Sequence, residues 1–280
     1  MKRLTSAICL TLAVLLGSGM RGSDLPTCIS DQIQDNDNCF GIFPYSTGVY
    51  DGEIKSGKPH GRGTFTYASG NIYVGEFKNG FPNGQGTHTD SLGDEYVGKF
   101  KNGKQHGYGT YTFGPSSEFA GDIYVGEWWE GKRPERGTYY FANGNKYVGE
   151  LREGGLHGHG TYTFGPSSKW AWDIYVGDFQ NGKRHGQGTY YFGTGGKYVG
   201  EFRNGSPNGK GTRTYSNGDQ YIGEFREGKK HGHGTFNRAN GSKYVGQLKG
   251  GKLHGNGTYT FTDGRKMKGV WENNKFINTK

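Results

Sequence analysis

The sequence is poor in aliphatic residues. Only 31% of its 280 residues are hydrophobic and only 3 are Met, which is too little to fill the thick core of a conventional globular domain. Aromatic residues, at 15% of the chain, must therefore carry most of the packing. Glycine is abundant, with 55 copies. Its regular spacing argues against a disordered low-complexity segment, and the absence of G-x-y triplets excludes collagen.

Long apolar runs are also missing, apart from AICLTLAVLL at residues 7–16. Lys2 and Arg3 precede this run and the small residues GSG follow it, which is the layout of a secretory signal peptide. Because the run is too short to span a bilayer of about 30 Å, we expect residues 1–22 to be a cleaved signal peptide; an uncleaved interfacial anchor is the alternative. Their removal lowers the formal net charge from +9 to +6, since it takes away three basic residues and no acidic one.

Cysteine is scarce as well. Cys9 falls within the signal peptide, which leaves Cys28 and Cys39 as a pair directly before the repeats described below. In an oxidising compartment we expect this pair to form a disulfide; two free thiols in a cytosolic protein are the alternative. A metal site is not expected, because the chain has no CxxC motif and the nearest histidine, His60, is far along the sequence.

A repeated phrase makes up nearly all of the remaining chain. YVGEFKNGFPNGQGT at residues 73–87 recurs as YVGEFRNGSPNGKGT at residues 198–212. The leading tyrosines are spaced by 23 residues, or by 28 after Tyr96 and Tyr147, and a fixed period in this range is typical of a solenoid or array. The nine tyrosines are Tyr50, Tyr73, Tyr96, Tyr124, Tyr147, Tyr175, Tyr198, Tyr221 and Tyr244, and Met267 takes the next place.

Each unit predicts one β-hairpin. Numbered from its tyrosine, the unit reads Y-V-G-E-F-x-N-G-K-x-H-G-x-G-T-Y-x-F, followed by a five-residue link. NG at positions 7 and 8 favours a two-residue type I′ turn, which would set position 5 opposite 10, 3 opposite 12 and 1 opposite 14. We therefore expect Tyr198 to face Gly211 and Gly200 to face Gly209.

The glycines and the aromatic residues are expected to share one face of the strands, because side chains alternate along a strand. Glycine weakens a strand, and an aromatic ring laid over it restores contact and shields the backbone. One hairpin is not stable by itself, whereas stacked hairpins continue both the hydrogen-bond ladder and the aromatic row.

The pattern Y-x-G-x-x-x-x-G-x-x-H-G-x-G resembles the MORN (membrane occupation and recognition nexus) repeat, in nine copies over residues 50–266. Residues 23–49, with CFGIFPYSTGVY, resemble a half unit that caps the N-terminus through Cys39, and residues 267–280 resemble a C-terminal half unit. The resemblance implies an all-β fold: an elongated, twisted antiparallel sheet of stacked hairpins, shaped as a half-pipe. It also implies attachment rather than chemistry.

Departures from the pattern concern mainly position 11, which is usually histidine. It becomes Pro134 in the fourth unit, where Glu135 also replaces a glycine, so we expect that unit to be irregular. Position 4 is usually acidic, and we expect cross-strand contacts such as Glu53 with His60 and Glu224 with His231. HGHG at 157–160 and 231–234 could bind a metal ion, but no third ligand is evident and solvent-facing histidines are the simpler interpretation.

Basic residues flank the hairpin tips at positions 6 and 9. We call this set the basic ridge: Lys58, Lys78, Lys101, Lys104, Lys132, Arg152, Lys183, Arg203, Arg226, Lys229, Lys249 and Lys252. Such a row would attract anionic lipid headgroups or an acidic polymer, with an attraction that falls with salt. The alternative is ordinary solvation of an exposed β surface.

Two links are longer than the others and are similar to each other. TFGPSSEFAGDIYVG at 112–126 and TFGPSSKWAWDIYVG at 163–177 each hold five extra residues. We expect these links to protrude from the edge opposite the hairpin tips. Phe119, Trp170 and Trp172 would then form a partner site, because tryptophan and other aromatic residues dominate binding hot spots. The alternative is that these rings fold back and cover the sheet.

The sequence therefore predicts a non-catalytic scaffold or adhesion protein, secreted or periplasmic, that binds a protein or envelope partner or associates with itself. Direct binding of an anionic membrane surface is the alternative, and an accessory subunit of an enzyme is a distant third. No cofactor, metal, nucleic acid or small-molecule substrate is expected. A flat repeating sheet lacks a substrate pocket, and residues 23–49 are too few for a catalytic domain.

Overall fold

The protein folds into one antiparallel sheet of 21 strands, each paired with the next strand along the chain. This computed structural model describes residues 25–29, 32 and 35–277. The signal peptide expected at residues 1–22 lies outside the described residues. The strands are β1 (Cys39–Tyr45), β2 (Gly48–Lys55), β3 (Lys58–Tyr67), β4 (Ile72–Lys78), β5 (Phe81–Thr89), β6 (Glu95–Lys101), β7 (Lys104–Thr112), β8 (Ile123–Trp128), β9 (Arg136–Tyr140), β10 (Lys146–Arg152), β11 (Gly155–Thr163), β12 (Ile174–Gln180), β13 (Lys183–Tyr191), β14 (Gly196–Arg203), β15 (Ser206–Tyr215), β16 (Gln220–Arg226), β17 (Lys229–Asn237), β18 (Lys243–Lys249), β19 (Lys252–Thr260), β20 (Lys266–Glu272) and β21 (Lys275–Ile277).

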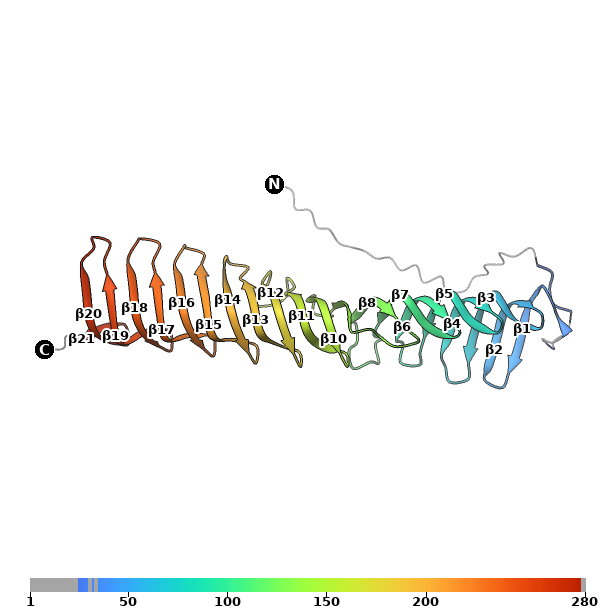
Figure 1. Ribbon diagram of the computed structural model, residues 1–280. Helices are drawn as coiled ribbons and strands as arrows, with labels where there is room; N and C mark the ends of the chain where they lie inside the picture. Colours follow the sequence, from blue (N-terminus) through green and yellow to red (C-terminus); the bar gives the residue numbers. More distant parts are fainter. Residues whose placement is uncertain (1–24, 30–31, 33–34, 278–280) are drawn as a thin grey trace.

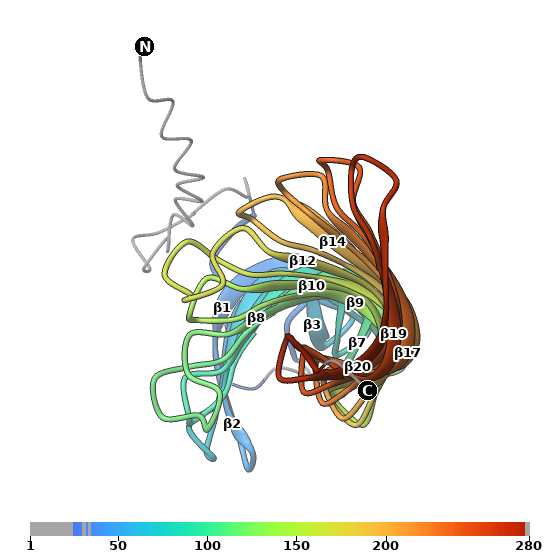
Figure 2. The ribbon, with the colours of Figure 1, turned by 90° about the vertical axis from the view of Figure 1, so that its left-hand side faces the viewer.

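The sheet is elongated, with β1 and β21 at its two ends (Figure 1). Viewed along its length, the strands curve around an open space without closing into a barrel, and the loops rotate progressively about the long axis (Figure 2). The rotation follows the right-handed twist that strands of L-amino acids favour. The predicted fold, a twisted sheet of stacked hairpins in half-pipe form, is confirmed.

The hairpin tips have the predicted turn type. Asn79 and Gly80 have φ of 53° and 90°, and Asn204 and Gly205 have φ of 51° and 85°. Positive φ at both central residues defines the type I′ turn, whose twist matches that of the flanking strands. Successive tips are also tied together, since the N–H of Gly205 donates to the carbonyl of Arg184 in the preceding unit (2.9 Å).

The strand register differs from the prediction beyond the tip. Near the turn Phe202 faces Pro207 as expected, but Tyr198 faces Arg213 and Gly200 faces Gly211. The expected pairs of Tyr198 with Gly211 and Gly200 with Gly209 are therefore wrong. A bulge between Gly200 and Phe202, opposite positions 11 to 13, shifts the register by two residues.

The bulge explains the glycine at position 12. Gly209 has a φ of +90°, in the region that L side chains rarely adopt, and the carboxylate of Glu201 lies where a Cβ would be. That carboxylate accepts a hydrogen bond of 2.9 Å from the N–H of Lys210. Of the two expected cross-strand pairs, Glu224 does lie opposite His231 in the register, whereas Glu53 falls within the bulge and does not pair with His60. In both units the carboxylate accepts the N–H at position 13, at 3.1 Å and 3.2 Å.

The core consists of aromatic rings gathered on one face of the sheet, which we call the aromatic face. Each leading tyrosine lies over the glycine pair of positions 3 and 14; a Cβ on Gly211 would lie 2.6 Å from Tyr198 Cζ. Tyr198 packs edge-on against Phe202 of its own unit at 5.1 Å and Phe225 of the next unit at 4.8 Å between ring centres. The rings thus cover the glycines, as predicted, and join each unit to its neighbour.

The fourth unit is irregular, as predicted. Its strands β8 and β9 pair only from Ile123 with Tyr140 to Gly126 with Gly137, and an isolated bridge joins Trp129 to Lys132. Pro134 cannot donate to the ladder, which accounts for the early end of the pairing.

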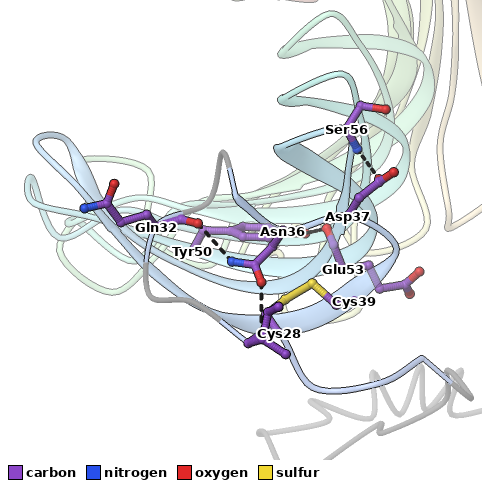
Figure 3. Close-up of a disulfide and its surroundings, with 9 residues drawn as sticks. Cys28, Gln32, Asn36, Asp37, Cys39, Tyr50, Glu53 and Ser56 are labelled. Atoms are coloured by element: carbon purple, nitrogen blue, oxygen red, sulfur yellow. Dashed lines mark hydrogen bonds between the residues drawn. A yellow bond between two sulfur atoms is a disulfide. The ribbon is translucent and has the colours of Figure 1, made fainter.

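The N-terminal end is closed by a disulfide. Cys28 and Cys39 are joined (Figure 3). The N–H of Cys28 also donates to the carbonyl of Phe40 in β1. Asn36, which is buried, accepts the N–H of Ile29 through its side chain, and its own carbonyl accepts the N–H of Gly57 in the first hairpin tip. The cap is therefore tied to both the edge strand and the first tip.

Candidate protein-interaction site in the long links

The two long links, residues 114–123 and 165–174, lie at the edge of the sheet opposite the hairpin tips. Both connect one hairpin to the next, β7 to β8 and β11 to β12. Their backbone hydrogen bonds match: Gly121 donates to the carbonyl of Phe113 (3.0 Å), and Trp172 donates to that of Phe164 (3.2 Å). The two links are therefore compact loops of one design rather than free segments.

Phe119 and Trp170 fold back onto the sheet. Phe119 lies 5.5 Å from Phe113 and Trp170 lies 5.7 Å from Phe164 between ring centres, both edge-on. About half of each ring stays exposed, 51% for Phe119 and 49% for Trp170. These two residues thus combine the covering role, stated above as the alternative, with an accessible surface.

Trp172 behaves differently. It is 67% exposed, and its backbone φ is +67°, in the left-handed region. The corresponding residue of the first long link is Gly121, with φ of +83°. Gly193 of the following link lies close by, so that a Cβ there would be 3.2 Å from Trp172 Cβ. A large exposed side chain therefore occupies a backbone position that favours glycine.

A charged side chain accompanies the tryptophans. The ammonium of Lys169 lies 4.1 Å from the centre of the Trp170 ring, a cation–π contact that holds the ring's exposed face. The surface of the second long link is thus aromatic and locally cationic, whereas the first link has Glu118 at the matching place.

A carboxylate anchors each long link and was not foreseen from the sequence. Asp173, two residues before Tyr175, accepts the hydroxyl of Tyr190 and the N–H of Gly193 (2.6 Å). Burial, followed by this hydrogen bond to Asp173, raises the pKa of Tyr190. Asp122 makes the same pair of bonds in the first long link, with the hydroxyl of Tyr139 and the N–H of Ala142 at 2.7 Å and 2.8 Å. This anchor could have been recognised in the sequence, because Asp or Asn recurs two residues before the leading tyrosine.

The basic ridge runs along the edge formed by the hairpin tips, and all twelve of its residues are exposed. Among the residues that the structure describes, none of the twelve forms an ion pair; the three ion pairs are Arg136 with Glu150, His159 with Asp178 and Arg265 with Asp263. Acidic residues interrupt the row at three turns, as Glu130, Glu153 and Glu227. The ridge is therefore free to meet an anionic surface, but it is not uniform.

The HGHG segments do not form a cluster of ligands. His159 pairs with Asp178 of the next unit at 3.1 Å, and no group of three or more His, Cys, Asp or Glu side chains in the described part of the chain could hold a metal ion. Two open surface hollows are present, one lined by Arg152, Leu156 and His157 and the other by Glu53, Arg62 and Glu76. Within the described residues, no helix is long and apolar enough to cross a membrane.

Three basic residues on the aromatic face were likewise not singled out from the sequence. Arg184, Arg213 and Lys230 occupy positions 10 or 16, where most units have proline, leucine or an aromatic residue. Each lies against rings of the core. These residues could have been recognised in the sequence, because cations replace apolar residues at these two positions.

Solved structures with some likeness to this chain share little of its sequence. The TCP domain of SAS-4 (dCPAP) from Drosophila melanogaster, solved with a proline-rich motif of Ana2, is 11% identical and has a TM-score of 0.35, with 67% of this chain and 90% of that chain covered. The TCP10 domain of Danio rerio CPAP is 9% identical with a TM-score of 0.39, covering 82% of this chain and 100% of that one. A streptogramin B lyase is 13% identical with a TM-score of 0.16, and 83% of each chain is covered. No curated protein matches.

The match to a family model is far more extensive. The MORN repeat model matches nine consecutive segments: residues 50–72, 73–94, 96–117, 124–146, 147–169, 175–197, 198–220, 221–243 and 244–264. These begin at the nine leading tyrosines and together span most of the sheet. The resemblance stated from the sequence is thus confirmed, and the chain belongs to the MORN repeat family.

Proposed function

We propose that this protein is an exported, non-catalytic scaffold that offers its β surface to a protein partner, with the second long link as the principal contact. The observation that carries the proposal is Trp172, an exposed indole held at a φ of +67° where the matching link has Gly121. A left-handed conformation costs a residue other than glycine about 1 kcal/mol or more. Such strain at an exposed side chain favours a role in contact over a role in stability.

The neighbouring residues support the same interpretation. Trp170 and Phe119 are half exposed, and Lys169 lies on the Trp170 ring. Tryptophan contributes disproportionately to binding energy, because a rigid ring supplies a large contact area at low entropic cost. The hydrogen bonds within each link fix the backbone in advance, which lowers the entropy lost on binding.

Export is part of the proposal. Residues 1–22 have the layout of a signal peptide, and a Cys28–Cys39 disulfide suits an oxidising compartment such as the extracellular space or a periplasm. A partner would then be another exported protein, an envelope component or a second copy of this chain.

The two links provide their own matched test. Replacing Lys169, Trp170 and Trp172 by Glu, Phe and Gly converts the second link into the sequence of the first. We expect this variant to fold with an unchanged or slightly raised thermal midpoint, since it removes backbone strain and little buried surface. Capture of partner proteins from the exported fraction, and self-association measured by sedimentation velocity, should both be compared with the parent protein.

The outcomes are distinct. Loss of a specific captured partner or of self-association, with the fold intact, supports the link as the site. Retained capture and retained self-association would move the site elsewhere on the sheet. Collapse of the fold would show that the rings serve as covers; the single change Trp172→Gly then tests the exposed ring alone.

A second candidate function is binding of an anionic membrane surface through the basic ridge. The observation in its favour is that all twelve ridge residues are exposed and that none has an ion-pair partner within the described residues. Near an anionic bilayer each such residue contributes about 1 kcal/mol, and this attraction falls with salt.

A further inference from the structure

Two cations on the aromatic face lie among rings of the core. Arg213 stands at position 16 of the seventh unit, and Lys230 at position 10 of the eighth. The guanidinium carbon of Arg213 is 3.2 Å from the centre of the Phe192 ring and 5.0 Å from that of Tyr215. Lys230 Nζ is 4.2 Å from the centre of the Phe236 ring and 5.6 Å from that of Tyr215. The two charges thus share Tyr215 as a neighbour.

Within the described part of the chain, neither charge forms an ion pair; Asp173 and Asp219 act on Arg213 and Lys230 only from beyond ion-pair distance. Among the described residues, no hydrogen bond or ion pair involves the guanidinium of Arg213 or the ammonium of Lys230. Partial burial lowers the pKa of both groups, and Arg238 lowers that of Lys230 further. By contrast, Arg184 in the sixth unit donates to the carbonyl of Gly205 (2.6 Å).

The nearby carboxylates are already engaged. Asp173 accepts bonds from Tyr190 and Gly193, and Asp219 accepts the N–H of Ala239 at 2.9 Å. Ring faces compensate only part of the lost hydration of a half-buried cation. An anion supplied from outside would therefore complete a site that the protein leaves without one.

The charge of the chain is concentrated in the same region. Residues 175–277 carry 17 Lys and Arg against 7 Asp and Glu, whereas residues 25–123 carry 7 against 11. These segments lie at opposite ends of the elongated sheet (Figure 1). The field of the molecule therefore attracts anions to the C-terminal units and repels them from the N-terminal ones.

We propose that the aromatic face of units six to eight, centred on Arg213 and Lys230, binds an extended acidic peptide segment of a partner protein. A flat bilayer would first meet the exposed basic ridge, whereas a single chain can enter between half-buried rings. Carboxylates on the same side of an extended peptide are spaced about 7 Å apart, which suits two cations that share one neighbouring ring. The inference rests on the proposed function as a protein-binding scaffold but uses another surface than Trp172.

The test uses the mature chain and a fluorescein-labelled decaglutamate peptide, with binding measured by fluorescence anisotropy. The variant Arg213→Tyr with Lys230→Leu restores residue types that other units carry, such as Tyr190 and Leu253, and should fold as well as the parent. We expect at least a tenfold loss of affinity. The matched control is Lys243→Gln with Lys266→Gln, which removes two exposed charges in the same basic region but outside the basic ridge and should change affinity less than threefold.

Three results would overturn the inference. The first is the absence of decaglutamate binding by the parent protein at low salt. The second is an equal loss of affinity in the two double variants, which would indicate attraction by net charge alone. The third is binding of heparin or of phosphatidylserine vesicles, but not of the peptide, in a way that depends on Arg213 and Lys230. None of these results alters capture through Trp172, so the proposed function is tested separately.

Discussion

The hydroxyl of Tyr198 donates a hydrogen bond of 3.0 Å to the carbonyl oxygen of Glu201. The ring thereby spans the glycine pair Gly200 and Gly211 and ends on the backbone group that the bulge leaves outside the ladder. The leading tyrosines of most other units repeat this bond, for example Tyr147 with the carbonyl of Glu150 at 2.7 Å. Each tyrosine therefore both fills the core and satisfies the bulge.

This arrangement predicts unequal effects of two small changes. Tyr198→Phe should cost about 1 kcal/mol, because it leaves the ring in place and removes one hydrogen bond. Gly211→Ala should cost about 2 kcal/mol or more, since its Cβ would lie 2.6 Å from the tyrosine ring carbons. Thermal and denaturant unfolding of the two variants measures the difference. Equal costs would contradict the close contact of ring and backbone.

The carboxylate at position 4 should be replaceable by an amide. In the ninth unit Gln247 already accepts the N–H of Asn256 at 3.0 Å, as Glu201 accepts that of Lys210. We expect Glu201→Gln to be nearly neutral and Glu201→Ala to cost about 1 kcal/mol. Hydrogen exchange of the Lys210 amide reports the bond directly. A large loss in the Gln variant would show that charge, rather than the acceptor, is required.

Stability should fall at alkaline pH. Burial raises the pKa of Tyr96 and Tyr147 to about 12, above the ordinary value of 10.0. Because the folded state holds these protons more tightly, the stabilisation is complete below pH 10 and is lost as the pH rises from 10 through about 12. Tyrosinate absorbance and the thermal midpoint should be followed together over this range. Titration of every tyrosine near pH 10 in a folded chain would contradict the prediction.

The disulfide should act locally. Replacing Cys28 and Cys39 by serine removes a cross-link worth about 2 to 4 kcal/mol. In an array with nearest-neighbour energetics, hydrogen exchange should accelerate in β1 to β3 and remain unchanged in β16 to β19.

Intact-mass analysis of the protein from its native compartment tests the related expectation of a mature N-terminus between residues 19 and 24. Two alkylatable thiols, or a mass that includes Met1, would contradict export.

Neutralising part of the basic ridge tests the membrane alternative. Changing Lys78, Lys101, Arg203 and Arg226 to glutamine should weaken flotation with phosphatidylserine vesicles and flatten its salt dependence. The fold should persist, because these exposed side chains lie at the hairpin tips. Unchanged flotation, or none by the parent protein at low salt, would assign the ridge to solubility.

The sequence by itself determined the fold class, the number of units and the turn type. The period of the leading tyrosines and the NG turns report local geometry, which neighbouring residues decide. The pairing of Cys28 with Cys39 was also accessible, because no other cysteine lies outside residues 1–22. The irregular fourth unit followed from Pro134, whose missing N–H is a local property.

Only the tertiary structure decided the register beyond the bulge and the surroundings of the candidate sites. A bulge forms where Gly209 takes a positive φ and Glu201 caps the opened backbone, and counting from the turn cannot reveal this shift. The left-handed conformation of Trp172 and the close approach of Gly193 from the next link are likewise seen only in the structure. Among the described residues, Arg213 and Lys230 form no ion pair, and Asp173 and Asp219 are engaged in other hydrogen bonds. Each of these features arises where separate units meet, and a repeat pattern describes only what the units have in common.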